Sequence, residues 1–224
     1  MPKLFLLRHL KSQWNEENRF TGWVDVPLAK ESAEKAKEIS EKIFQLKIDK
    51  IYSSALIRNT DTVSRLLVNQ EKYPIFSHLD KGKMKDWGKF EELNKNYAPV
   101  YISEALNERY YGKLQGKNKQ EAMKKYGVEK VKMWRRSYDI APPGGESLKD
   151  VIKRTTPFYK KYIKKDLKAG KNVLVVASHN PLRSIVKYIE GISDKDIVDF
   201  EVPYGGLTQY DFNDSLKVIG KEAF

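Results

Sequence analysis

The sequence contains no cysteine and only three histidines among its 224 residues. The lack of cysteine excludes a disulfide-stabilised scaffold, thiolate metal sites and cysteine nucleophiles. Any imidazole chemistry must therefore use His9, His78 or His179. No apolar run approaches the ~20 residues of a membrane-spanning helix, and no long apolar segment with a small-residue cleavage site marks a targeting signal. These absences predict a cytoplasmic protein that does not bind membranes.

The charge is strongly basic, with 42 Lys and Arg against 30 Asp and Glu, which gives a formal net charge of +12. Such a balance favours anionic partners, which include phosphorylated metabolites, nucleic acid and acidic surfaces. Lysines scattered over solvated helix faces would produce the same total. Because no nucleic-acid-binding motif accompanies the charge, we do not expect nucleic acid as a partner.

Short apolar segments alternate with segments of helical periodicity along the chain. Strands are predicted over residues 4–7, 48–54, 173–177 and 208–212. Amphipathic helical spacing is found over residues 31–46, 58–68, 118–126, 128–138, 148–167 and 181–190. Strands that alternate with helices indicate a layered α/β fold.

The periodicity weakens between residues 69 and 103, where prolines, glycines and mixed charges interrupt it. We interpret this segment as an insertion or lid with short elements. The chain has no internal repeat and no low-complexity tract. Residues 1–224 are therefore predicted to form a single domain that carries this insertion.

Charged and polar side chains follow three of the predicted strands. Arg8 and His9 come directly after the first strand, Arg58 follows the second within about one turn of a helix start, and His179 follows the strand at 173–177. Ligands of open α/β sheets bind beyond the carboxyl ends of the strands. An imidazole can attack a phosphoryl group, and a guanidinium can neutralise its oxygens. Each residue alone could be an ordinary surface residue, but together they predict a phosphate-handling site.

Five further blocks of the sequence are distinctive: LRH at 7–9, FTGWVDV at 20–26, LNERYYG at 106–112, WRRSYD at 134–139 and GGESL at 144–148. Together they resemble the cofactor-dependent phosphoglycerate mutases of the histidine phosphatase superfamily. The FTGW, LNER and WRRSYD blocks are specific, since ordinary histidine phosphatases lack them, and the resemblance covers nearly the whole chain. It implies a three-layer α/β sandwich whose mostly parallel central sheet is flanked by helices.

The resemblance also implies a reaction. It is the interconversion of 3-phosphoglycerate and 2-phosphoglycerate through a phosphohistidine primed by 2,3-bisphosphoglycerate, with no metal. His9 would be the nucleophile, Glu108 the general acid and base, and Arg8, Arg58 and His179 the ligands of the transferred group. The residues implied to bind substrate are Ser12, Asn15, Thr21, Gly22, Arg109, Tyr111, Lys119, Arg135, Arg136 and Asn180. The implied partners are small phosphorylated three-carbon acids and further copies of the chain, in a dimer or tetramer.

Three positions depart from the family pattern. Leu10 stands where the family has glycine, and its side chain could crowd the phosphate. Ser178 stands in the register of the family's second histidine, so His179 takes that role only if the loop shifts by one residue. Tyr204 replaces the threonine of the usual Pro-Thr-Gly.

Two other functions stay open at this stage. A histidine phosphatase acting on small phosphorylated metabolites would use water in place of the second hydroxyl, and a catalytically weakened paralogue would bind phosphoglycerate without forming phosphohistidine. Lys119, Arg135 and Arg136 favour the mutase, because hydrolysis alone does not require a carboxylate to be held. Leu10 and Ser178 motivate the weakened paralogue.

Overall fold

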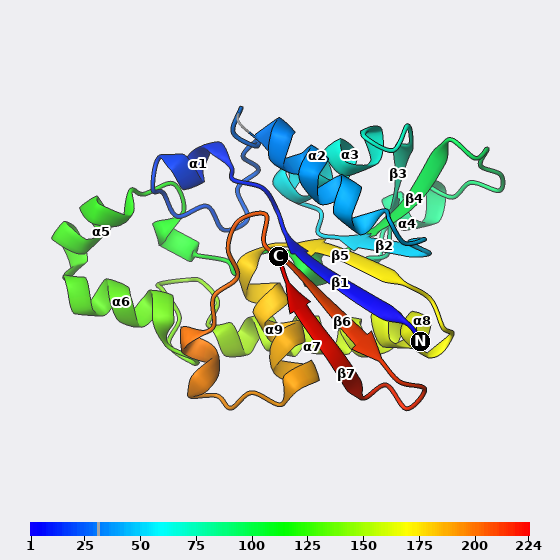
Figure 1. Cartoon of the computed structure of the whole chain (residues 1–224). Helices are drawn as coiled ribbons and strands as arrows, with labels where there is room; N and C mark the ends of the chain where they lie inside the picture. The colour runs from blue at the N-terminus through cyan, green and yellow to red at the C-terminus, as the bar shows by residue number, and fades with distance from the viewer. Residues whose placement is uncertain (31) are drawn as a thin grey trace.

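The computed structural model describes residues 1–30 and 32–224, and a mixed β-sheet forms its centre. Seven strands in this described part pair in the order β3-β4-β2-β5-β1-β6-β7 (Figure 1). Their bounds are β1 Lys3–Arg8, β2 Lys50–Ser53, β3 Tyr73–His78, β4 Tyr97–Ile102, β5 Val173–Ala177, β6 Leu207–Phe212 and β7 Val218–Ala223. All neighbouring pairs from β3 to β1 are parallel, whereas β6 is antiparallel to both β1 and β7. The predicted α/β fold with a mostly parallel sheet is confirmed.

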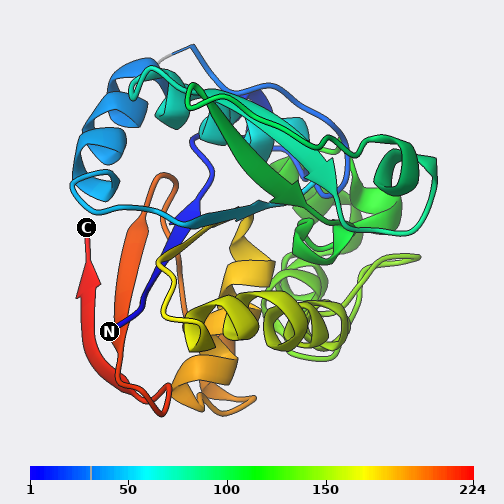
Figure 2. The same cartoon turned by 90° about the vertical axis from the view of Figure 1, so that its right-hand side faces the viewer.

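Helices cover both faces of the sheet. The α-helices are α1 Gln13–Glu16, α2 Ser32–Ile43, α3 Ile57–Val68, α4 Lys83–Trp87, α5 Lys119–Tyr126, α6 Val128–Arg136, α7 Leu148–Phe158, α8 Lys164–Lys168 and α9 His179–Glu190. Four shorter helical segments are η1 Glu104–Leu106, η2 Gly112–Leu114, the π-helical η3 Tyr159–Ile163 and η4 Asp196–Asp199. Helices α2 and α3 lie on one face and α7, α8 and α9 on the other (Figure 2). This is the predicted three-layer arrangement.

The central strands are apolar on both faces because both faces are covered. Phe5 and Leu7 of β1 pack with the apolar cluster beneath α2 and α3, while Leu4 and Leu6 pack with the cluster on the α7 and α9 side. Every residue of β5 is fully buried. Such continuous apolar runs are typical of parallel strands between two helical layers, which is why these strands could be predicted from the sequence.

The segment 69–103 extends the sheet. Its short elements include β3 and β4, which run parallel to β2 at the edge. The alternation of apolar and polar residues expected of strands is weak in this segment, because β3 and β4 are only half-buried and each contains a proline. An edge strand tolerates Pro74, and Pro99 lies before the stretch of β4 that pairs with β2.

Other boundaries differ from the prediction in ways that local chemistry explains. The predicted helix at 148–167 contains a π-helical segment that begins at Tyr159, two residues after Pro157, which has no N–H to donate to the helix. Helix α9 begins at His179, two residues before the predicted start. Strand β7, helix α1 and the strand character of 69–103 were not predicted. Glu31, the first residue of the predicted helix at 31–46, lies outside the described residues. Across the described chain, no helix is both long and apolar enough to span a bilayer.

Candidate active site

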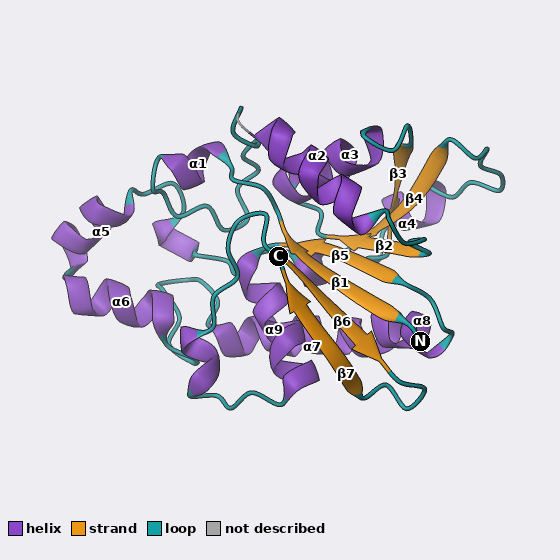
Figure 3. Ribbon diagram, viewed as in Figure 1, coloured by secondary structure: helices purple, strands orange, loops and turns teal. Residues whose placement is uncertain are grey.

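A cavity of about 240 Å³ opens beyond the carboxyl ends of β1 and β5. Loops from several parts of the chain meet there, and α5 and α6 lie on its side away from the sheet (Figure 3). Fourteen of the predicted site residues line it: Arg8, His9, Asn15, Thr21, Gly22, Arg58, Glu108, Arg109, Tyr111, Lys119, Arg135, Arg136, His179 and Asn180. No residue between 69 and 103 does so; of the two predicted roles for this segment, an insertion or a lid, its placement favours the insertion.

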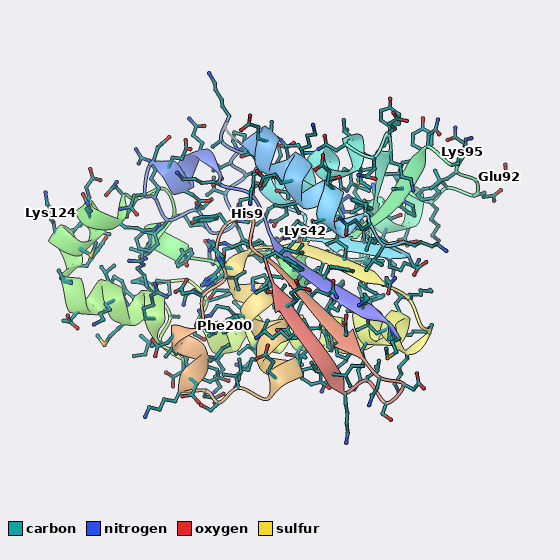
Figure 4. All side chains as sticks on the ribbon, in the orientation of Figure 1. His9, Lys42, Glu92, Lys95, Lys124 and Phe200 are labelled. Carbon is teal, nitrogen blue, oxygen red and sulfur yellow. The ribbon has the colours of Figure 1, made fainter. Side chains whose placement is uncertain are left out.

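His9 lies at the end of β1 with only 2% of its surface exposed (Figure 4). Its Nδ1 lies 2.6 Å from the carbonyl oxygen of Leu10. A neutral imidazole can make this contact only as an Nδ1–H donor, and Nε2 then carries the lone pair. Burial, together with the charges of Arg58 and Arg8, holds the pKa of His9 well below its usual value. The ring is therefore neutral near pH 7 and can act as a nucleophile through Nε2.

Leu10 does not crowd the cavity, and the prediction that it could do so was wrong. Its side chain is buried in the apolar cluster beneath α2 and α3, and it is not among the lining residues. Its backbone N–H donates to Thr62 Oγ1 at 3.2 Å. The adjacent loop has a glycine, Gly205, next to the Leu10 side chain, and a Cβ added there would lie 3.3 Å from Leu10 Cδ2. A leucine therefore replaces the family's glycine without filling the site.

Glu108 lines the same cavity as His9 and is held there as a carboxylate. Its Oε1 accepts hydrogen bonds from Asn180 Nδ2 at 2.6 Å and from the backbone N–H of Arg109 at 2.7 Å. Burial alone would raise the pKa of Glu108, but these hydrogen bonds and the charges of Arg58 and Arg8 outweigh it and lower that pKa. Glu108 can therefore accept a proton from a substrate hydroxyl.

His179 is the first residue of α9, and its side chain lines the cavity. Burial and the charge of Arg8, followed by those of further arginines, lower the pKa of His179 well below its usual value. Ser178 is buried elsewhere, and its Oγ accepts a hydrogen bond from Asn59 Nδ2 at 3.1 Å. His179 therefore lines the cavity and Ser178 does not, as the role predicted for His179 requires.

The arginines of the cavity use only some of their guanidinium N–H groups in contacts within the described part of the protein, and other N–H groups have no partner there. Arg58 donates to the carbonyl oxygens of Gly22 at 2.7 Å and Val24 at 3.1 Å. The guanidinium of Arg8 lies 3.7 Å from the ring centre of Tyr204. Among the described residues, buried polar atoms without a hydrogen-bond partner include Arg8 Nε, Thr21 Oγ1, Arg109 Nε, Arg109 Nη1 and Arg183 Nε. Buried donors are rarely left unpaired, so this set favours a bound anion.

Lys119 begins α5 on the outer side of the cavity. Burial, followed by the charges of Arg135 and Arg8, lowers the pKa of Lys119 to about 8. An anion near Lys119 would favour its protonated form. The lysine therefore suits a carboxylate or phosphate better than a neutral group.

Ser12 was predicted to bind substrate, but it does not line the cavity. It is fully buried, and both its backbone N–H and its Oγ donate to Asn15 Oδ1, at 3.1 and 2.8 Å. These two bonds occupy the amide oxygen of Asn15. The NH2 group of Asn15 is then the part available to an anion, so Ser12 orients a lining residue.

Five lining residues were missed in the sequence: Arg19, Phe20, Arg183, Glu201 and Tyr204. Arg183 had a usable signal, because it lies one helical turn after Asn180 and donates to Asn180 Oδ1 at 3.2 Å. Glu201 and Tyr204 belong to a loop before β6, and no local pattern places that loop beside β1. Among the described residues, no group of three or more His, Cys, Asp or Glu side chains is arranged to hold a metal ion.

Comparison with known proteins identifies close relatives. The family model described as "Histidine phosphatase superfamily (branch 1)" matches residues 4–98 and 87–221. The 2,3-bisphosphoglycerate-dependent phosphoglycerate mutase of Methanococcus vannielii is 46% identical, over 98% of this chain and 95% of that protein. The protein of the same name from Chlamydia pneumoniae is 44% identical, over 94% of this chain and 93% of that protein.

Solved structures share the fold at lower identity. The alpha-ribazole phosphatase from Shigella flexneri superposes with a TM-score of 0.73 at 19% identity, covering 96% of this chain and 92% of that chain. This likeness shows the fold alone.

Proposed function

This chain belongs to the histidine phosphatase superfamily, and within it to the 2,3-bisphosphoglycerate-dependent phosphoglycerate mutases, and we propose that its cavity interconverts 3-phosphoglycerate and 2-phosphoglycerate through a phosphohistidine. One arrangement supports this reaction best. A neutral His9 with its lone pair on Nε2 and a Glu108 carboxylate share a cavity with arginines that have buried N–H groups without an acceptor in the chain as described.

The phosphoryl group is carried by His9 Nε2. In transfer to substrate, the nitrogen–phosphorus bond breaks as an oxygen–phosphorus bond forms at a free hydroxyl of the acid, and Glu108 takes the hydroxyl proton. At the other carbon the same residues act in reverse: Nε2 accepts a phosphoryl group, and Glu108 returns the proton to the departing oxygen. Arg8 and Arg58 would neutralise the oxygens of the transferred group, and His179 would donate a hydrogen bond to them.

The cofactor 2,3-bisphosphoglycerate would supply the phosphoryl group that primes His9. The site suits such a trianionic or more highly charged molecule, because its lining combines buried donors without acceptors with cations at its outer side. Arg109, Lys119 and Arg135 would hold the carboxylate and the second phosphate. Asn15, Thr21, Gly22, Tyr111, Arg136 and Asn180 would complete the set of polar contacts.

The placement of five residues favours a mutase over a phosphatase and over a catalytically weakened paralogue. Leu10 and Ser178, which motivated a catalytically weakened paralogue, both lie outside the cavity. Lys119, Arg135 and Arg136 all line it, and a phosphatase has no need to hold a substrate carboxylate there.

The proposal also covers the domain organisation, substrates, cellular compartment and assembly of the enzyme. Residues 1–224 would act as one domain, whose segment 69–103 inserts strands into the sheet. The substrates would be small phosphorylated three-carbon acids, the enzyme would work in the cytoplasm, and copies of the chain would assemble as a dimer or tetramer.

The test follows conversion of 3-phosphoglycerate to 2-phosphoglycerate and release of inorganic phosphate in parallel, with and without 2,3-bisphosphoglycerate. His9→Ala should abolish conversion. His78→Ala is the matched control, since His78 lies in β3 outside the cavity, and it should retain conversion. Release of phosphate without isomerisation would instead assign a phosphatase. Absence of both reactions would refute the assignment of His9 as a working nucleophile.

A further inference from the structure

Glu201 is a carboxylate in a cavity whose charged lining residues are mostly cations. Among the described lining residues there are seven arginines and Lys119, but the only carboxylates are Glu108 and Glu201. Glu108 is buried and hydrogen-bonded, as its proton transfer requires. Glu201 has no part in that chemistry. Its presence in a site for anions therefore needs a separate explanation.

The carboxylate of Glu201 contacts two groups proposed to bind substrate. Its Oε1 forms an ion pair with Arg136 Nη1, and its Oε2 lies 3.2 Å from His179 Nε2. The second contact is not aligned as a hydrogen bond, because His179 Nε2 is among the buried atoms without a partner. Glu201 thus occupies the place of an anion beside His179 without satisfying the imidazole as a well-placed phosphoryl oxygen would.

The Glu201 side chain is exposed enough to move away from His179 and Arg136. It is 51% exposed, and the residue lies on the loop between η4 and β6, directly after Phe200, which Figure 4 labels. Exposed ion pairs contribute little free energy, so an incoming anion can replace them. Arg136 is itself 44% exposed at this side of the cavity.

We propose that Glu201 is an internal competitor for substrate, whose carboxylate lies between His179 and Arg136 in the free enzyme and is displaced when a phosphorylated acid binds. A phosphorylated three-carbon acid regains the displaced contacts and adds others at Arg109, Lys119 and Arg135. Inorganic phosphate has no second anionic group with which to add those contacts. Glu201 would therefore keep the free site from filling with ambient phosphate. The identity of the acid rests on the proposed function, whereas the competition with phosphate does not.

The test compares Glu201→Gln with Asp199→Asn by calorimetric titration with inorganic phosphate and, without primer, with 3-phosphoglycerate. Glu201→Gln removes the competing charge at nearly constant shape. Asp199→Asn removes the same charge from an exposed residue two positions earlier that does not line the cavity. We expect Glu201→Gln to tighten the binding of both ligands by the same factor, roughly two- to fivefold, because each ligand displaces the same carboxylate. Asp199→Asn should change either dissociation constant by less than about twofold.

Three outcomes would overturn the proposal. Unchanged phosphate binding in Glu201→Gln would show that the carboxylate does not compete. Weaker binding would show that it holds Arg136 and His179 in place for the ligand. Equal tightening in Asp199→Asn would assign the effect to net charge. None of these readouts needs turnover, so failure of the mutase assay would leave the phosphate result interpretable.

Discussion

Asn180 tunes the proton acceptor, and its replacement should change the pH dependence of the reaction in a defined direction. In the structure Asn180 Nδ2 donates to Glu108 Oε1 at 2.6 Å, and both residues are buried. Asn180→Ala removes this bond while the burial that raises the pKa of Glu108 persists. The pKa of Glu108 should therefore rise, and the carboxylate should be lost at a higher pH.

The size of the effect follows from the strength of the bond. A hydrogen bond to a charged group contributes about 1.5–3 kcal/mol, and one pKa unit corresponds to about 1.4 kcal/mol. The acidic limb of the kcat/KM profile should therefore move upward by about one to two pH units. Since kcat/KM reports groups of the free enzyme, the position of this limb is separable from any loss of substrate contacts, which lowers the whole profile.

The assay measures kcat/KM for 3-phosphoglycerate between about pH 4.5 and 9 with saturating primer. Asn15→Ala is the matched control, because Asn15 also lines the cavity but bonds to Ser12 and not to Glu108. It should lower the profile without moving its acidic limb. An unmoved limb in Asn180→Ala, or an equal movement in Asn15→Ala, would refute the assignment of Glu108 as the proton acceptor tuned by Asn180.

Two further predictions concern substrate binding and the core. Burial lowers the pKa of Lys119 to about 8, so KM for 3-phosphoglycerate should increase as the pH rises through 8 and the lysine loses its charge. Lys119→Arg should flatten that increase. A KM in the wild type that stays constant up to about pH 9 would contradict a role of Lys119 in binding. Leu66 is a fully buried residue of α3, so Leu66→Ala should lower the free energy of unfolding by about 2–5 kcal/mol in urea titrations. Val68→Ala, in the same helix at a position 59% exposed, should lower it by less than about 0.5 kcal/mol. Similar losses in both variants would contradict the packing described.

The predicted family and fold are confirmed. They could be predicted because several of the charged site residues lie next to apolar segments that are easy to identify in the sequence. Arg8, His9 and Arg58 come directly after buried strands or at the start of the next helix, so an apolar run locates them. The blocks at 106–112 and 134–139 could be identified only by resemblance, since nothing in their own periodicity brings them to the sheet.

The parts that could not be predicted depend on contacts between distant segments. Glu201 and Tyr204 reach the cavity because a loop before β6 passes the end of β1, where the N–H of Gly205 donates to the carbonyl oxygens of Arg8 and His9. The direction in which Leu10 points is set by the cluster beneath α2 and α3, which contains residues from five strands and two helices far apart in sequence. Strands β3 and β4 were not predicted because most of their residues are only partly buried, so their sequences show little apolar periodicity.

The hydrogen bond from His9 Nδ1 to the carbonyl of Leu10 has a consequence for how this enzyme can change. The acceptor is a main-chain atom, so no side-chain substitution can alter its chemistry. Its position depends on Leu10, which is anchored among the apolar residues beneath α2 and α3. The choice of Nε2 as the nucleophilic nitrogen is thereby fixed from the hydrophobic layer on that side of the sheet. Lys119, Arg135 and Arg136, at the outer side of the cavity, belong to α5 and α6. Changes in those two helices can therefore alter which acid is bound without altering which nitrogen of His9 reacts.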